Sequence, residues 1–292
     1  MRQAAALLIR QGQRARVLLV LPDGLRHRCP AGLTVDGEDC LPPGRTQARS
    51  VRWYHVRPDA RGYDNRTYCR TAAARPCLQP IAYRLGEIEA LRGRSMFEAA
   101  EVPALQRPGT HWLEVWLSRG ERLARRFSAA ARPASFSLVV RRDDSYVGHL
   151  TELLGVPYVF APTRVRSLGH QTDLRLGVDC VALAVYGQRR LRPDAAPPYL
   201  SLAGLLLRTR LLLRAPSLPA LLGHRPPAKP GDLIHLNHHV AVLSRDRAPA
   251  GLGPEDVVIH ALQGVAEEVA LARLPTTGRP VRLLRWRVES VP

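Results

Sequence analysis

One cysteine of this chain stands where a catalytic nucleophile would be expected. Cys180 follows Asp179 at the start of the apolar run Val-Ala-Leu-Ala-Val-Tyr, which ends at Tyr186. This order is typical of a helix N-terminus, where free backbone N–H groups and the helix dipole favour a thiolate over a thiol. Because the thiolate is the nucleophilic form, we expect Cys180 to be a reactive cysteine.

Two histidines follow in segments that read as β-strands. His239 begins the alternating stretch His-Val-Ala-Val-Leu, and His260 lies within Val-Val-Ile-His-Ala. A cysteine, an imidazole that takes its proton and a second polar group that orients the imidazole are the components of a cysteine acyl-transfer enzyme. His238 competes with His239 as the base, but strand alternation sends the two side chains to opposite faces. The His-Val-Ala-Val pattern favours His239.

Two other interpretations of these residues are open. A lone cysteine in an apolar helix is most often a packing residue. Cys180 and the two histidines could also hold a zinc ion, with a fourth ligand from His235 or Asp232. The chain has no short paired-ligand motif such as His-Glu-x-x-His. We therefore predict no metal and no cofactor, and we interpret Cys180 as a nucleophile.

The other four cysteines all lie in the first third of the chain, at Cys29, Cys40, Cys69 and Cys77. Their spacings are wider than those of zinc knuckles, which favours two local disulfides, Cys29 with Cys40 and Cys69 with Cys77, over a structural zinc. Disulfides indicate an oxidising compartment, so we expect an extracytoplasmic protein, periplasmic or secreted. The N-terminal run Ala-Ala-Ala-Leu-Leu-Ile is too short for a secretory signal, and we expect a signal peptide to be absent from this chain.

The net charge of the chain does not identify a specific binding partner. The formal net charge is +18, almost all of it from arginine, which predicts attraction to polyanions in general. The arginines are spread along the chain instead of gathering near aromatic residues, so we expect no specific nucleic-acid binding. No stretch approaches the roughly 18 consecutive apolar residues of a membrane-spanning helix, so we expect no transmembrane segment.

A chain of 292 residues suits two domains. Residues 1–134 read mostly as short strands broken by turns, including 51–56 and a hairpin over 112–127, and predict a small β-sandwich-like accessory domain that ends in a linker. Residues 81–99 could form either a helical insertion or a strand plus loop.

Residues 135–292 predict a second domain in which helices precede an antiparallel sheet, an α+β arrangement. Residues 145–154 predict a helix that is closed by Gly155, and a second helix is expected from Cys180 to about Arg190. The leucine-rich segment 202–222 predicts an amphipathic helical excursion, with a membrane-surface or substrate-groove role as the alternative. The predicted strands are 135–140, 233–236, 239–243, 257–261 and 281–288.

Four blocks of this second domain resemble the catalytic domain of the NlpC-type papain-like cysteine peptidases, which hydrolyse peptide bonds in bacterial cell walls. The resemblance implies a papain-like fold with helices packed on an antiparallel sheet. It also implies that Cys180 is the nucleophile, His239 the general base, His260 the group that orients the base, and Tyr158 a tyrosine packed beside the nucleophile. The blocks are Gly155 to Phe160, Asp179-Cys180, Pro230 to Val242 and Ile259 to Ala261.

The chain departs from the family pattern around the nucleophile. Val181 stands where the family usually has serine, and Ala161-Pro162 stand where it usually has two glycines. The interval between His239 and His260 is longer than usual, which an inserted hairpin loop over 245–256 explains.

The resemblance implies a cysteine peptidase or amidase that cleaves an amide bond in peptidoglycan stem peptides, or in another peptide-containing wall polymer. The accessory domain would position the enzyme. Two alternatives remain: a catalytically inactive wall-binding or polyanion-binding protein on the same fold, and an acyltransferase that uses the same thioester intermediate.

Overall fold

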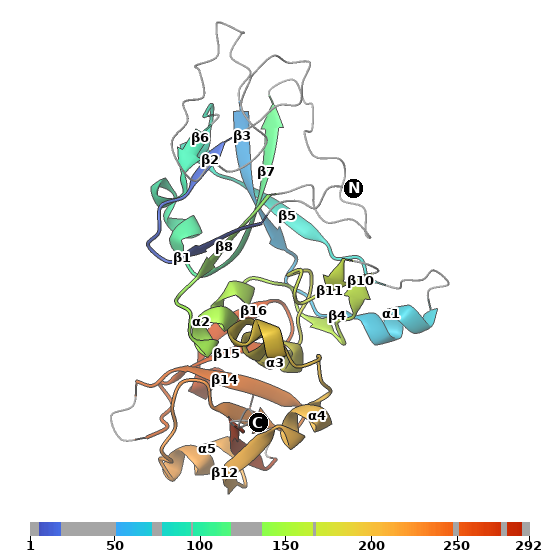
Figure 1. The fold of residues 1–292 in the computed structure, drawn as a ribbon, viewed down its shortest axis with the longest axis vertical. Coiled ribbons are helices and arrows are strands. Elements are labelled where there is room, and N and C mark those ends of the chain that lie inside the picture. Colours follow the sequence, from blue (N-terminus) through green and yellow to red (C-terminus); the bar gives the residue numbers. More distant parts are fainter. Residues whose placement is uncertain are drawn as a thin grey trace, which may run out of the picture. The chain divides into compact units, whose positions relative to one another are not determined.

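The chain divides into two compact units, which are described separately. The first unit comprises Met1–Asp59 and Pro80–Arg142, and the second comprises Ala60–Gln79 and Asp143–Pro292. The second unit therefore includes a segment, 60–79, that the sequence analysis assigned to the accessory domain. The computed structural model (Figure 1) describes residues 6–18, 51–71, 78–94, 96–117, 136–165, 168–247, 251–275 and 279–287.

The first unit is built on a five-stranded sheet in the order β1-β8-β7-β3-β5. The strand β8 (Phe136–Arg141) pairs in parallel with β1 (Ala6–Arg10), and the other neighbours are antiparallel. The remaining strands of this sheet are β7 (Gly109–Leu117), β3 (Val51–Pro58) and β5 (Tyr83–Glu87), and a separate pair consists of β2 (Arg16–Leu18) and β6 (Met96–Glu98). Single turns of 3₁₀ helix lie at Glu89–Leu91, Ala99–Glu101 and Pro103–Gln106. Residues 81–99 thus form strands and turns, which was one of the two expected alternatives.

The core of the first unit follows from strand alternation. Along β3 the side chains of Val51 and Trp53 are buried in this core, while Arg52 between them is exposed. The Trp53 ring meets Phe97 edge-on, with ring centroids 4.9 Å apart, and its Nε1–H donates to the carbonyl oxygen of Arg94 at 2.8 Å. The large aromatic side chain is therefore buried with its polar atom satisfied.

The second unit is a mixed α+β structure with a six-stranded, fully antiparallel sheet. The predicted strands after residue 230 are present, and the sheet gains two strands that were not predicted, β12 and β16. In spatial order the strands are β12 (Thr209–Ala215), β17 (Val281–Trp286), β13 (Leu233–Leu236), β14 (His239–Arg245), β15 (Val257–Ala261) and β16 (Ala266–Ala270).

Helices cover both faces of this sheet (Figure 1). The helix α3 (Cys180–Leu191) packs against β14 and β15, and α2 (Tyr146–Leu150) packs against α3. On the other face α5 (Leu218–Gly223) contributes to the core around Ile234 and Ala241. Because α3 is buried from Cys180 through Gly187, its apolar sequence is that of a central helix. The helix predicted over 145–154 is the shorter α2, which Ser145 caps, followed by a 3₁₀ turn, and Gly155 adopts a positive φ of 83° beyond it.

The expected helical excursion over 202–222 is wrong. The segment folds as α4 (Leu202–Leu207), then the strand β12, then α5. Residues of β12 pair with β17, which supplies the hydrogen-bond partners that an edge strand needs. Local leucine periodicity could not reveal that partner, because it lies about seventy residues further along the chain.

Shorter elements complete the second unit. The strand β4 (Tyr63–Asp64) pairs in parallel with β9 (Val159–Phe160), so segment 60–79 is joined to this unit by backbone hydrogen bonds. The helix α1 (Asn65–Thr71) follows β4 directly. The remaining elements are β10 (Arg164–Val165), β11 (Gly169–His170) and 3₁₀ turns at Thr151–Leu153, Pro193–Ala195 and Leu271–Arg273.

Several sequence predictions fall outside the described residues. Cys29, Cys40 and Cys77 lie there, so neither predicted disulfide is tested, and Cys69 lies in α1. The second half of the predicted hairpin and the linker over 129–134 also lie outside. Within the described residues, no helix has the length and apolar character needed to cross a membrane.

Candidate active site

Cys180 occupies the first position of α3, as the sequence predicted. Asp179 caps the helix: its Oδ1 accepts the Ala182 N–H at 2.7 Å, and its Oδ2 accepts the Ala161 N–H at 3.3 Å. A cap of this kind contributes about 1 kcal/mol to helix stability. The cap also fixes the direction in which the first residue of the helix presents its side chain.

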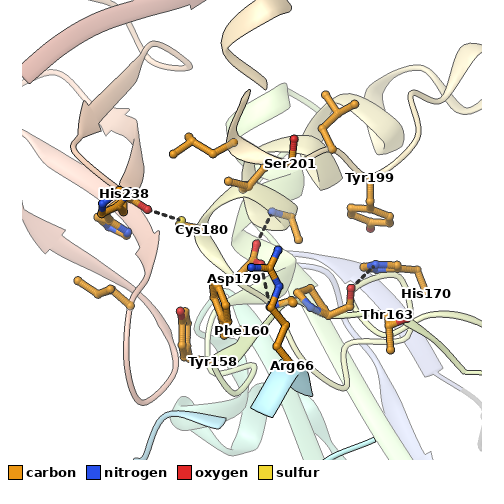
Figure 2. Close-up of a pocket in the computed structure, with 18 of the residues that line it drawn as sticks. Arg66, Tyr158, Phe160, Thr163, His170, Asp179, Cys180, Tyr199, Ser201 and His238 are labelled. Carbon is orange, nitrogen blue, oxygen red and sulfur yellow. Dashed lines mark hydrogen bonds between the residues drawn. The ribbon is translucent and has the colours of Figure 1, made fainter. Parts of the chain in front are cut away.

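The thiol of Cys180 lies against the backbone on both sides of His239. Its Sγ is 4.0 Å from the carbonyl oxygen of His238 (Figure 2). Burial, with a smaller contribution from the nearby Asp179 charge, raises the pKa of the thiol to about 12, although the backbone N–H of Val240 acts in the opposite direction. The thiolate expected from the helix N-terminus is therefore not the resting form, because burial and the capping carboxylate outweigh the helix dipole.

The His239 side chain is buried and paired with His260. Its Nε2 lies 3.2 Å from Nδ1 of His260, and the two rings meet edge-on with centroids 5.2 Å apart. Burial lowers the pKa of His239 to about 3, with a smaller contribution from His260, and lowers that of His260 to about 4. Both imidazoles are therefore neutral at pH 7.

Neutral rings allow the tautomer to be assigned from the hydrogen-bond partners. If His239 donates its Nε2–H to Nδ1 of His260, the Nδ1 of His239 carries a lone pair. Among the described residues this buried Nδ1 has no hydrogen-bond partner. An unpartnered acceptor is the form that a general base must have before it takes a proton.

A carboxylate continues this chain of polar groups. The Nε2 of His260 lies 3.7 Å from Oε1 of Glu267, which stands opposite it on the neighbouring strand β16. The sequence analysis did not include Glu267, because it did not predict β16. A hairpin between 261 and 266 was the missing signal, since it places residues 260 and 267 side by side.

Three of the four predicted site residues line one pocket of about 740 Å³, namely Cys180, His239 and Tyr158. Burial raises the pKa of Tyr158 to about 12, and the charges of Cys180 and Asp179 add to this effect. His260 is not among the lining residues; it contacts the pocket only through His239.

The choice between the two adjacent histidines agrees with their burial. His239 is 6% exposed and paired, whereas His238 is an exposed residue whose carbonyl oxygen contacts the thiol. His238 lies in the turn before β14 and His239 is the first residue of that strand, so the two side chains are separated by the end of the turn and not by the strand alternation that the sequence analysis assumed.

All residues of the pocket belong to the second unit, and several were not anticipated. The start of α4 supplies an apolar wall that includes Leu200 and Leu202. Arg66, from segment 60–79, lines the same pocket, although the sequence analysis placed this segment in the other domain. Arg66 reaches the pocket because β4 pairs with β9, a contact between segments that are far apart in the sequence.

His170 is a pocket residue that the sequence analysis did not include in the site. Its ring stacks on Tyr199 at a centroid distance of 3.7 Å, and its Nε2 lies 3.0 Å from the carbonyl oxygen of Pro162 (Figure 2). Tyr199 in turn donates to Asp173 at 2.7 Å. These contacts join segments that sequence spacing does not relate. His170 and Tyr199 both line the pocket.

The departure from the family pattern at Ala161 has a structural consequence. Ala161 adopts a φ of 55°, in the left-handed region that favours glycine. A non-glycine residue in this region costs about 1–2 kcal/mol. The backbone beside the pocket therefore keeps a glycine-like conformation, which the Ala161 hydrogen bond to Asp179 holds in place.

The alternative zinc interpretation finds no support in the geometry. The carboxylate of Asp232 is held by Arg285 through two bonds of 2.6 and 2.7 Å. Over the described parts of the chain, no group of three or more His, Cys, Asp and Glu side chains is arranged to hold a metal ion.

Comparisons with known proteins add no relative. No protein-family model matches the chain, and neither a search of curated proteins nor a search of solved structures finds a match. The functional argument therefore depends on the residues and geometry of this chain alone.

Proposed function

We propose that the second unit is a cysteine hydrolase that cleaves an amide bond in the peptide part of a bacterial cell wall, with a papain-like arrangement of Cys180, His239 and His260. The observation that carries the proposal is the state of His239. Its Nε2 is engaged by His260, while its Nδ1 is buried and lacks a partner among the described residues. His239 lines the same pocket as Cys180, whose thiol lies at a helix N-terminus.

In the proposed reaction, Cys180 attacks the substrate carbonyl carbon as its S–H proton passes to Nδ1 of His239. The carbonyl π electrons move to oxygen, and the oxyanion collapses to expel the amine, which takes the proton back from His239. The product of this half-reaction is a thioester on Cys180. Water, deprotonated by His239, then attacks the thioester and releases the carboxylic acid and the thiol.

The resting state determines the order of these events. The raised pKa of Cys180 and the lowered pKa of His239 favour a neutral thiol and a neutral imidazole over an ion pair. Proton transfer must therefore accompany formation of the C–S bond, when negative charge moves from sulfur to the carbonyl oxygen. The imidazolium that forms is stabilised by His260 and, through it, by Glu267.

The oxyanion needs a donor beside the nucleophile. The backbone N–H of Cys180 is at the first helical position, where backbone N–H groups have no intrahelical partner. We assign it as the oxyanion donor, a type of interaction worth about 10²–10³ in rate when one donor is removed.

The test offers purified peptidoglycan to the wild type and to Cys180→Ala. We expect new amino groups and released muropeptides with the wild type only, at a rate at least about 10³-fold above the variant. Cys180→Ser serves as a near-isosteric control, and thermal unfolding of both variants shows that loss of product is not loss of fold.

Two outcomes would contradict the proposal. Reducing sugar ends without new amines would indicate cleavage of a glycosidic bond, which this site has no carboxylate pair to perform. Equal products from wild type and Cys180→Ala would remove the cysteine from the reaction. Binding of peptidoglycan with no product of either kind would favour the inactive binding protein instead.

A further inference from the structure

The strand β12 is one edge of the six-stranded sheet. In the part of the chain that the structure describes, it pairs with β17 alone, and it lies between α4 and α5 at the margin of the sheet (Figure 1). The strand Thr209–Ala215 therefore presents a row of backbone N–H and C=O groups that no described strand occupies. An edge of this kind is a template onto which another extended segment can add.

Apolar side chains are exposed at this edge. Leu207 is 77% exposed and Leu211 is 57% exposed, and they are the two most exposed large apolar side chains among the described residues. Leu211 continues a cross-strand row that is formed by Leu284, Leu233 and Val242, all of which are buried. An apolar side chain on an added strand would extend this row and cover Leu211.

The charge of the same segment is entirely positive. Between Asp194 and Asp232 the chain has no acidic residue. Arg210 and Arg214 on β12 are exposed, and neither guanidinium forms an ion pair with a described residue. Arg214 also stands opposite Arg282 of β17, and like charges directly opposite each other destabilise a sheet. A carboxylate on the free side of β12 would offset this repulsion.

A bulge in β12 determines the pattern that a partner must have. The pairing with β17 shifts within the three leucines of β12, so Arg210 and Arg214 stand opposite Arg285 and Arg282, which are only three residues apart. Because side chains alternate along a strand, the two arginines of β12 lie on opposite faces of the sheet. A regular added strand meets both arginines when its acidic residues are three apart, with apolar residues between them.

We propose that the β12 edge binds an extended acidic segment of another protein by strand addition, with an apolar side chain beside Leu211 and carboxylates beside Arg210 and Arg214. The inference goes beyond the proposed function and does not depend on it, because no residue of β12 lines the Cys180 pocket. A second copy of β12 lacks the required charge: an antiparallel pair centred on Leu212 would place each Arg210 opposite an Arg214.

The experiment titrates full-length Cys180→Ala, which cannot cleave the probe, by calorimetry. The probe is the peptide Thr-Val-Glu-Val-Val-Glu-Val-Thr, acetylated and amidated at its ends, and the matched peptide has Gln in place of both Glu residues. We expect the acidic peptide to bind about three- to tenfold more tightly, as two cross-strand charge pairs allow. Hydrogen exchange followed by mass spectrometry should slow over 209–215 when the peptide is added and should not change around Cys180.

Methylation of the peptide nitrogens tests the strand pairing itself. Alternate N–H groups of a strand point to the same side, so two further peptides carry N-methyl groups on one or the other alternate set of amides. Methylation of the set that faces β12 should weaken binding at least about tenfold, and methylation of the other set should not. Equal binding by the parent peptide and both methylated peptides would show that charge alone attracts the peptide, which would overturn strand addition.

Variants of the protein test the charge requirement. Arg210→Gln combined with Arg214→Gln should abolish the preference for the acidic peptide. The matched control combines Arg192→Gln with Arg225→Gln, two exposed arginines outside β12, so that it removes the same charge and should retain the preference. Thermal unfolding of both double variants checks that they are folded. A preference that survives without Arg210 and Arg214 would contradict the inference.

Other occupants of the edge give other results. No binding of either peptide, or slowed exchange outside 209–215, would overturn the inference. Self-association of the protein through β12 would assign the edge to a second copy. Binding to phosphatidylglycerol vesicles that depends on Leu207 and Leu211, without peptide binding, would assign it to a lipid surface. Each of these two results would also overturn the inference.

Discussion

Two polar clusters contact the helix α3, one at its first residue and one near its middle. The first consists of Cys180, His239 and His260. The second is centred on Glu152, which is fully buried and meets the helix through Tyr186. Both lie in the core of the second unit, yet their hydrogen bonding differs in kind.

Both carboxylate oxygens of Glu152 are occupied. Its Oε2 accepts from Tyr186 and from Arg175, each at 2.6 Å, and its Oε1 lies 3.2 Å from Nδ1 of His149. Although burial opposes ionisation, Arg175 and Tyr186 lower the pKa of Glu152 below its usual value. This cluster holds a charge in the core by surrounding it with donors.

The Cys180 cluster is left incomplete. Its histidines have lowered pKa values and its thiol a raised one, because burial is not balanced by opposite charges. The comparison teaches that burial alone does not distinguish a structural cluster from a reactive one. What distinguishes them is whether the buried atoms have partners and whether the cluster opens on a pocket.

The largest effect that separates the clusters should come from His239→Ala. Removing the general base should reduce the rate of amine release by about 10²–10⁴-fold. His238→Ala is the control on the neighbouring position, and its rate should stay within about threefold of the wild type, because His238 contacts the thiol through its backbone carbonyl oxygen, which the substitution keeps. Rates are measured on stem peptides under conditions where both variants are folded. A larger loss in His238→Ala than in His239→Ala would show that the base was assigned to the wrong residue.

Glu152→Gln should affect stability instead of chemistry. Neutralising the carboxylate leaves Arg175 without its partner in the core, which should cost about 3 kcal/mol in the free energy of unfolding. Urea titration measures this loss, and Glu255→Gln, at an exposed position, is the control. The rate per folded molecule should remain within about tenfold of the wild type. A complete loss of activity at unchanged stability would mean that the two clusters are not separate.

The pH dependence of stability should distinguish the clusters as well. The folded pKa of His239 lies near 3, below the unfolded value of 6.5, so the unfolded state binds more protons between these values. Stability due to this group is therefore complete above pH 6.5 and falls on acidification. Between pH 7.5 and pH 5 the wild type should lose roughly 2 kcal/mol more than His239→Gln does. Parallel pH profiles for the two proteins would contradict the lowered pKa.

The smallest effect should come from the strained backbone beside the pocket. Ala161→Gly relieves the left-handed conformation and should stabilise the fold by about 1 kcal/mol. The control is Ala203→Gly, in the helix α4, where the same substitution should destabilise by about 1 kcal/mol. Thermal unfolding of the two variants should shift in opposite directions. A destabilised Ala161→Gly would mean that the unfolded-state entropy of glycine outweighs the strain.

Local sequence was enough to locate several elements of the second unit. The Asp179 cap, the start of α3 at Cys180, and the strands β13, β14, β15 and β17 all follow from capping residues and short-range apolar periodicity. Local pattern also singled out Cys180 and His239, and the family resemblance added Tyr158; the fold brings all three to one pocket. These are features that neighbouring residues specify among themselves.

Other features depended on contacts between distant segments. The strand β12 exists because β17 offers it a partner, and Glu267 meets His260 because β16 pairs with β15. Segment 60–79 belongs to the second unit because β4 pairs with β9, and that pairing brings Arg66 to the pocket. The partners of β12 and β4 lie too far along the chain for residue periodicity to report, whereas the pairing of β15 with β16 is a local hairpin whose turn the sequence analysis missed.

The protonation state of Cys180 shows the same division between what local sequence specifies and what the tertiary structure decides. From sequence alone, the helix N-terminus around Cys180 predicted a thiolate, since a dipole and free N–H groups are local properties of a helix. Only the tertiary structure decided that the thiol is protonated, because packing around Cys180 removes water from the thiol, and the carboxylate of the preceding residue Asp179 acts in the same direction. Desolvation depends on everything that surrounds a group, whereas sequence lists only what precedes and follows it.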